Sequence, residues 1–143
     1  MNKIYTILLT TIAVIFLGSC SKDVLKSYED RIIGTWQLDR VNRVGFGGDT
    51  DDLPFREGSQ FEFNENGGLV FTDTNGEVYS GSWDIERTFV NDQQVRQLHI
   101  AAVNFTTQQV RSELFEEIQF TGTNKFKGFI RQGLRTYVFH FER

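Results

Sequence analysis

The sequence predicts an all-β protein, an eight-stranded antiparallel up-and-down barrel preceded by a short N-terminal helix. From Ile32 onward, apolar residues recur at every second position in eight short runs, which is typical of half-buried strands. Gly, Asn and Asp separate the runs, and two of the separators are Asn-Gly pairs, a strong hairpin signal. Eight neighbouring strands are enough to close a sheet and remove its unpaired edges. Fourteen Phe, four Tyr and two Trp supply a core.

Residues 1–19 are predicted to be a signal peptide. Lys3 gives a positively charged start, and the uncharged apolar run Ile4–Leu17 follows it. That run is shorter than the roughly 20 residues that a membrane-spanning helix needs.

Leu17-Gly18-Ser19-Cys20 resembles the bacterial lipobox and contains the only cysteine of the chain. The resemblance implies that Cys20 is lipidated after cleavage and anchors the protein to the membrane as an outer-membrane lipoprotein, facing either the periplasm or the cell surface. Several acyl chains give stable anchoring where one gives marginal binding. The alternative is an ordinary secretory signal followed by a free thiol.

The part that follows residue 19 is long enough for one domain. Residues 20–31 are expected to form a tether that becomes a short helix, because Val24, Leu25 and Tyr28 fall at helical spacing, and residues 32–143 the barrel. The whole chain has 15 basic and 19 acidic residues and a net charge of −4. A nucleic-acid partner is not expected, because phosphate binding needs clustered Lys and Arg.

The first half of the barrel is predicted to contain strands at 32–41, 59–65, 69–73 and 77–86. Alternation places Trp36 and Leu38 on one face of the first strand, and Phe61 and Phe63 on one face of the second. Asn66-Gly67 and Asn75-Gly76 form the next two turns.

The second half is predicted to contain strands at 95–103, 110–120, 125–131 and 134–142. Residues 87–94 are polar and are expected to end in a loop at Asn91 and Asp92. In the strand at 110–120, Leu114, Ile118 and Phe120 are expected to face one way.

One long connection, residues 42–57, joins the first two predicted strands and contains the only proline. Loops of this length in compact domains are usually functional or disordered. The segment is either a lid over an open barrel mouth or an insertion with no role. Asp49, Asp51 and Asp52 lie in it, but they lack the glutamate and central glycine of a calcium loop.

Gly34-Thr35-Trp36, directly after the predicted helix, resembles the Gly-x-Trp motif of lipocalins. Gly81-Ser82-Trp83 repeats the pattern, as in small lipocalin-like domains of Bacteroidetes lipoproteins. The resemblance implies that the motif tryptophan plugs the closed end of the barrel, beneath an arginine from near the last strand. Simple core packing is the alternative for both tryptophans. The candidates for the arginine are Arg131, Arg135 and Arg143.

The residues with chemical potential do not assemble an active site, so no enzymatic activity, cofactor or metal is expected. His99 and His140 lie in separate predicted strands without a cysteine partner, which disfavours zinc. Glu116 and Glu117 are adjacent in a strand, so their side chains are expected to point to opposite faces.

Binding is therefore the expected function: a lipid-anchored, lipocalin-like envelope protein that holds a small apolar or amphipathic ligand. An accessory subunit of an outer-membrane or secretion complex is the alternative, with a filled barrel, an envelope protein partner, and Phe115, Val70 and Phe129 facing outward. A bulge would invert some of the pocket residues that follow, because one extra residue flips every side chain beyond it. Strand alternation gives the candidate pocket residues as Phe61, Phe63, Phe71, Leu98, Ile100, Leu114 and Phe139.

Overall fold

The computed structural model describes residues 26–45 and 53–143, which form one antiparallel sheet and one short helix. The sheet has nine strands in the order β6-β5-β4-β3-β2-β1-β9-β8-β7. Helix α2 (Tyr28–Ile32) precedes it, and the Ser27 hydroxyl caps the helix by accepting a hydrogen bond from the Asp30 amide at 3.1 Å. The strands are β1 (Gly34–Val44), β2 (Gln60–Phe63), β3 (Gly68–Thr72), β4 (Val78–Val90), β5 (Gln93–Val103), β6 (Val110–Phe115), β7 (Glu117–Phe120), β8 (Lys125–Gln132) and β9 (Arg135–Glu142).

The predicted all-β class, the short helix and the antiparallel pairing of chain neighbours are confirmed. The predicted eight-stranded closed barrel is wrong, because the sheet has nine strands and two ends. The expected strand at 110–120 is divided at Glu116. Its first part, β6, pairs with β5, and its second part, β7, pairs with β8. The two ends of the sheet are thus consecutive in the chain, but no ladder joins them.

The break at Glu116 has a visible physical cause. Phe115 and Ile118 are both buried although they are three positions apart in the sequence, so one residue does not follow the alternation. The amide of Glu116 donates to the carbonyl of Phe129 at 2.9 Å. Arg131 Nη1 lies 3.2 Å from Glu116 Oε2, and its Nη2 lies 2.8 Å from Glu117 Oε2. The expectation that the two glutamates point to opposite faces is wrong, because the break brings both to Arg131.

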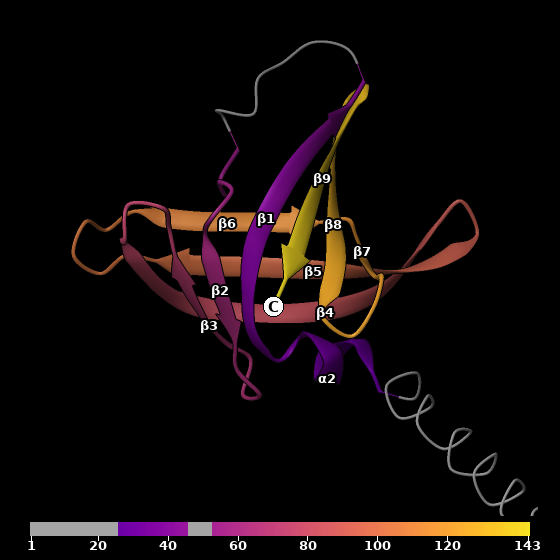
Figure 1. Cartoon of the computed structure of the whole chain (residues 1–143). Helices are drawn as coiled ribbons and strands as arrows, with labels where there is room; N and C mark the ends of the chain where they lie inside the picture. The colour runs from indigo at the N-terminus through magenta and orange to yellow at the C-terminus, as the bar shows by residue number, and fades with distance from the viewer. Residues whose placement is uncertain (1–25, 46–52) are drawn as a thin grey trace, which may run out of the picture.

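The connection between β4 and β5 also differs from the prediction. Both strands continue through the polar region, with Val90 paired with Gln93. Asn91 and Asp92 alone form the turn, with φ of 50° and 63°. Two successive positive φ values are the geometry of a type I′ turn, whose twist matches that of the flanking strands. The expected loop at 87–94 is therefore a continuous hairpin, which projects from the body of the molecule (Figure 1).

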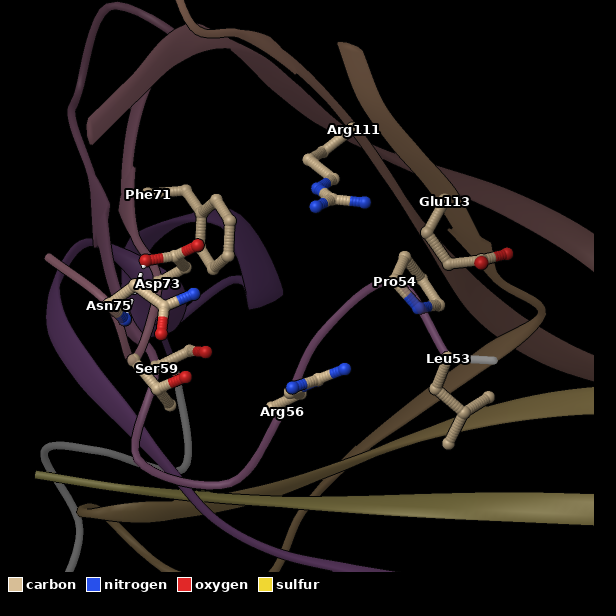
Figure 2. A pocket seen from close by; sticks show the side chains of 10 residues that line it. Leu53, Pro54, Arg56, Ser59, Phe71, Asp73, Asn75, Arg111 and Glu113 are labelled. Carbon is tan, nitrogen blue, oxygen red and sulfur yellow. Dashed lines mark hydrogen bonds between the residues drawn. The ribbon is translucent and has the colours of Figure 1, made fainter. Parts of the chain in front are cut away.

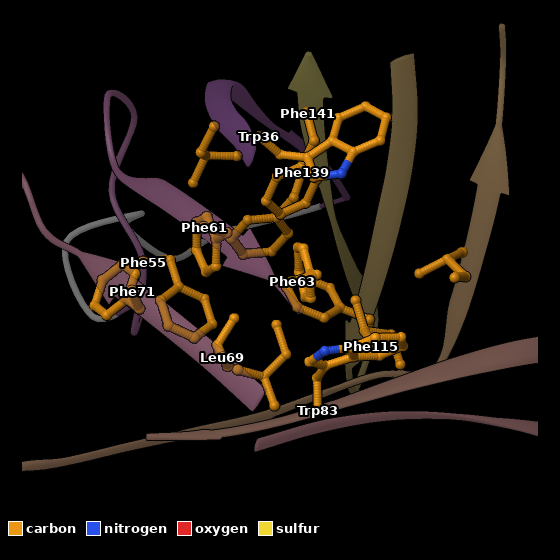
Figure 3. Packing of buried hydrophobic residues seen from close by; sticks show 14 of the residues in the cluster. Trp36, Phe55, Phe61, Phe63, Leu69, Phe71, Trp83, Phe115, Phe139 and Phe141 are labelled. Atoms are coloured by element: carbon orange, nitrogen blue, oxygen red, sulfur yellow. The ribbon is translucent and has the colours of Figure 1, made fainter. Parts of the chain in front are cut away.

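The sheet bends over on itself, so that β4, β5 and β6 cross behind β1, β9 and β8 at a steep angle (Figure 1). The inner faces of the two layers enclose an aromatic core (Figure 3). Phe126 and Phe141 stack with ring centroids 4.4 Å apart, and Phe115 lies edge-on to Phe139 at 5.2 Å. Edge-to-face and offset contacts of this kind add to the free energy gained from burial.

Candidate functional site

Trp36 is fully buried where α2 meets the sheet, and a guanidinium group covers its ring. Its indole Nε1 donates to the carbonyl of Ile32 at 2.6 Å. Arg143 places its guanidinium carbon 4.2 Å from the centre of the Trp36 ring. Among the three arginines that the sequence left open, Arg143 is therefore the one that packs on Trp36. An arginine over an indole face gains a cation–π attraction.

The Arg143 guanidinium also joins three segments of backbone. Its Nη1 donates to the carbonyl of Ile33 at 2.9 Å, and its Nη2 donates to the carbonyls of Arg31 at 3.3 Å and Thr123 at 3.1 Å. Gly34 has φ of +116°, and a Cβ there would lie 3.0 Å from Arg143 Nη1. Glycine is needed at this point by both the backbone conformation and the close approach of Arg143. We call these contacts the Arg143 clasp.

The second motif, around Trp83, also packs into the core. Trp83 Nε1 donates to the carbonyl of Asn64 at 3.1 Å, and its ring lies edge-on to Phe63 at 5.6 Å. A Cβ at Gly81 would lie 1.9 Å from the carbonyl oxygen of Ala101 on β5. Gly81 thus lets β4 approach β5 closely.

The candidate pocket residues are buried, with one exception, and they pack against one another. Leu114 is 40% exposed, so its assignment to an interior pocket is wrong. Phe115 is fully buried, so its expected outward orientation is wrong as well. The break at Glu116 is the reason, because the expected face was extrapolated back from Ile118 across it. The other two markers of the alternative function, Val70 and Phe129, are half-buried.

The long connection fills part of the space that a ligand would need. After the segment at 46–52, the described part of this connection resumes at Leu53. Phe55 in this part inserts its ring into the core and is 1% exposed. The Phe55 ring lies edge-on to Phe61 and Phe71, both at 5.1 Å, and parallel to Phe115 at 6.3 Å. The expected lid falls in part on residues 46–52, which lie outside the described residues.

A cleft of about 470 Å³ opens beside this inserted segment. The β3–β4 turn, the inner face of β6 and the segment at 53–59 form its walls (Figure 2). Ligand pockets commonly measure about 300 to 1,000 Å³. The described lining residues are Leu53, Pro54, Arg56, Ser59, Phe71, Asp73, Thr74, Asn75, Arg111 and Glu113.

Two arginines reach the cleft from opposite walls. Arg56 begins a tight turn in which the Ser59 amide donates to the Arg56 carbonyl at 3.1 Å, with Gly58 at φ +91°. Arg111 lies on β6 opposite Ala102, and its guanidinium carbon is 5.7 Å from the centre of the Tyr79 ring. Figure 2 shows both guanidinium groups directed into the space between the walls. Among the described residues, neither arginine forms an ion pair with a carboxylate.

The polar groups around the arginines differ in how they are satisfied. Asp73 Oδ1 accepts hydrogen bonds from the amides of Asn75 at 2.8 Å and Glu77 at 3.0 Å, so it stabilises the β3–β4 turn. Burial raises the pKa of Glu113, although the Leu114 amide opposes this by donating to the carboxylate. Ser59 is 1% exposed, and its hydroxyl has no hydrogen-bond partner within the described chain. A buried hydroxyl in this state is rare in folded proteins.

Comparison with protein-family models, curated proteins and solved structures finds no match to this chain. The site is therefore interpreted from its own geometry. No helix within residues 26–45 or 53–143 is both long and apolar enough to cross a membrane. The same residues contain no group of three or more His, Cys, Asp or Glu side chains placed to hold a metal ion. Cys20 and the predicted signal peptide lie outside the described residues.

The sequence interpretation missed the cleft arginines, although one signal for Arg111 was present. Residues 111, 113 and 115 alternate toward the interior, so that β6 presents Arg111 and Glu113 beside the buried Phe115. The inner face of β6 thus carries two charged residues before it reaches the core at Phe115. Arg56 could not have been found in this way, because it lies in a connection without periodicity.

Proposed function

We propose that the protein is a lipid-anchored binding protein of a bacterial envelope that holds a small amphipathic ligand in the cleft between Arg56 and Arg111, without catalysis. The observation that carries the proposal is the composition of the cleft. Its wall is mostly polar, and two arginines without ion pairs among the described residues provide a charged end. Phe71 and Leu53 are both buried and add only a small apolar surface beside the arginines, which suits a ligand with a short apolar part.

The position of the ligand differs from that of a ligand enclosed by a barrel. Phe55, Phe61 and Phe71 pack together in the interior, so an apolar molecule has to displace them to enter. The cleft requires no such displacement. It also offers the polar contacts that an amphipathic ligand needs.

The test uses the mature lipoprotein in dodecyl maltoside, with hexanoate and hexan-1-ol as probes and ligand-observed NMR as the readout. Thr74→Trp puts a large side chain at the exposed rim of the cleft, and Thr107→Trp puts one on an exposed turn elsewhere. We expect at least one probe to bind the unmodified protein and Thr107→Trp, and to be lost from Thr74→Trp. Binding of neither probe, or binding unaffected by Thr74→Trp, contradicts the proposal.

Attachment to the membrane is a separate part of the proposal and rests on the lipobox-like residues before Cys20. Mass spectrometry of the mature N-terminus should find acyl chains on Cys20. Cys20→Ala should leave the protein unacylated and unprocessed. An unmodified free thiol on the mature protein would contradict anchoring without affecting the binding site.

A second candidate function, an accessory subunit that docks an envelope protein, is favoured by exposed apolar residues on the outer face of β6 and in the β5–β6 turn. Phe105 is 78% exposed and Val110 is 68% exposed, and Val110 pairs with Val103. Leu114 lies on the same outer face of β6. Exposed apolar groups that gather in one place mark interaction surfaces.

This second candidate predicts that the lipoprotein migrates as part of a larger complex when envelopes are solubilised gently. The double variant F105S/V110T should release it as a free monomer while its thermal unfolding midpoint stays unchanged. A lipoprotein that already migrates as a monomer, with or without the substitutions, contradicts the accessory-subunit function.

A further inference from the structure

We propose that the ligand of the cleft carries an oxyanion, either a carboxylate or a phosphate, that binds between Arg56 and Arg111 and accepts a hydrogen bond from Ser59. The inference rests on the proposed function, because it specifies the polar end of the same ligand. It commits to a charge that the proposed function leaves open.

The first argument is the state of the two arginines. Guanidinium groups match the planar oxygens of carboxylates and phosphates, and bind them with two parallel hydrogen bonds. Elsewhere in the described fold, Arg131 and Arg143 are engaged by two glutamates and by three carbonyls, respectively. Arg56 and Arg111 both line the cleft, and neither has a carboxylate partner among the described residues; Arg111 contacts the neutral Tyr79. Within the described part of the chain, no carboxylate neutralises their charges.

The second argument is that the nearby carboxylates do not take this role. Asp73 accepts two backbone amides of its own turn, which partly satisfies its charge. The carboxylate of Glu113 turns away from the space between the arginines (Figure 2). Burial raises the pKa of Glu113, and its carboxylate already accepts a hydrogen bond from the Leu114 amide at 3.1 Å.

The third argument is the hydroxyl of Ser59. It is buried, lines the cleft, and has no hydrogen-bond partner within the described chain. A hydroxyl that loses its water without gaining a partner destabilises the folded protein. An oxygen atom of the ligand would accept a hydrogen bond from this hydroxyl and remove that penalty. Ser59 therefore adds a neutral donor to the two charged donors.

The wall of the cleft indicates what is attached to the oxyanion. Phe71 and Leu53 line the cleft beside the polar groups, and both belong to the aromatic core cluster. Phe71 is 1% exposed and Leu53 is 8% exposed, so the apolar part of the wall is small. A short alkyl body attached to the oxyanion is enough to cover it.

The experiment compares four six-carbon probes that differ only in their polar end: hexanoate, hexyl phosphate, hexan-1-ol and hexylammonium. Dissociation constants are measured by ligand-observed NMR on the mature lipoprotein in dodecyl maltoside, with empty micelles as the blank. We expect hexanoate or hexyl phosphate to bind at least roughly tenfold more tightly than hexan-1-ol, since charge-assisted hydrogen bonds are stronger than neutral ones. Hexylammonium should bind most weakly. The order of the two anions distinguishes a carboxylate from a phosphate ligand.

The variants assign the discrimination to named side chains. Arg56→Gln and Arg111→Gln should each weaken binding of the preferred anion by roughly tenfold and leave hexan-1-ol unchanged. Ser59→Ala should weaken it by a smaller factor. Arg87→Gln, at an exposed site on β4, is the matched control and should have no effect. Thermal unfolding midpoints of all variants show whether a loss of binding comes from misfolding.

Two results overturn the inference in different ways. If hexan-1-ol binds as tightly as the anions and the arginine variants bind normally, the cleft binds a ligand but not through an oxyanion. In that case the proposed function stands and the inference is wrong. If no probe binds the unmodified protein, the proposed function fails and the inference fails with it.

Discussion

Arg143 shows how one side chain connects parts of the chain that are far apart in sequence. Its guanidinium packs on Trp36 and donates to carbonyls of α2, of the α2–β1 junction and of the β7–β8 turn. Each contact is modest alone, because the site is exposed to solvent. Together they fix α2 and the start of β1 to the residue that follows β9.

We expect Arg143→Ala to lower the free energy of unfolding by about 2 to 3 kcal/mol, because it removes a cation–π contact and three charge-assisted hydrogen bonds. Arg143→Lys should recover only part of the loss, since an ammonium cannot reproduce the planar fork. Urea denaturation measures both values. Arg87→Ala is the control, and an equal loss there would show that the clasp is not the cause.

His140 makes stability depend on pH in a defined direction. Burial, together with Arg40 and Lys127, lowers its pKa from the ordinary value of 6.5, while Asp39 opposes the shift. The unfolded chain therefore binds the proton more readily. This contribution to stability is fully present above pH 6.5 and is lost as the pH falls below it.

The comparison of the protein with His140→Gln isolates this effect. The difference between their unfolding free energies should be constant above about pH 7 and should shift in favour of the variant between about pH 6.5 and 5. Denaturant titrations at four pH values measure it. A difference that does not change with pH would show that protonation of His140 does not destabilise the folded protein.

At the scale of elements, the alternation of apolar residues located the strands, but it did not give the buried face correctly along all of them. Each predicted run other than 110–120 forms one strand, because apolar residues at every second position can be buried together on only one face of a sheet. The break at Glu116 could not be predicted in this way. It depends on hydrogen bonds to Phe129 and Arg131, which lie on a strand that comes later in the chain. The error at Leu114 follows directly from it.

The inverted phase gives a sharp test. Phe115→Ala should lower the free energy of unfolding by about 3 to 5 kcal/mol, because it leaves a cavity beside Phe139 and Phe55. Leu114→Ser, one residue away, should change it by less than about 0.5 kcal/mol. Equilibrium unfolding in urea measures the pair. A larger effect of Leu114→Ser than of Phe115→Ala would indicate that Leu114 is the buried residue, as uniform alternation predicts.

At the scale of the whole molecule, the fold has a filled interior and an open cleft at its side. The position of the cleft depends on Phe55, which comes from the long connection and occupies space between β2, β3 and β6. A connection has no alternating pattern from which the burial of an aromatic residue could be predicted. The sequence therefore predicted that the core is aromatic, but not that a loop residue completes it.

Removal of this ring tests whether the interior can become a container. Phe55→Ala should lower the free energy of unfolding by about 3 to 5 kcal/mol. It should also open an apolar cavity that takes up the neutral dye N-phenyl-1-naphthylamine, which the unmodified protein should exclude. Dye fluorescence and urea denaturation on the same samples check both outcomes. Equal dye uptake by the two proteins would show that the interior is accessible with Phe55 in place.

The Arg143 clasp has a mechanical consequence. Arg143 holds the carbonyls of Arg31 and Ile33, directly after the segment that would lead to the lipid anchor. If Cys20 carries the proposed anchor, a pull on it is expected to load α2 and Arg143 before it loads the hydrogen bonds between strands. Under tension, we expect α2 and the Arg143 clasp to yield first, while the cleft between Arg56 and Arg111 keeps its shape.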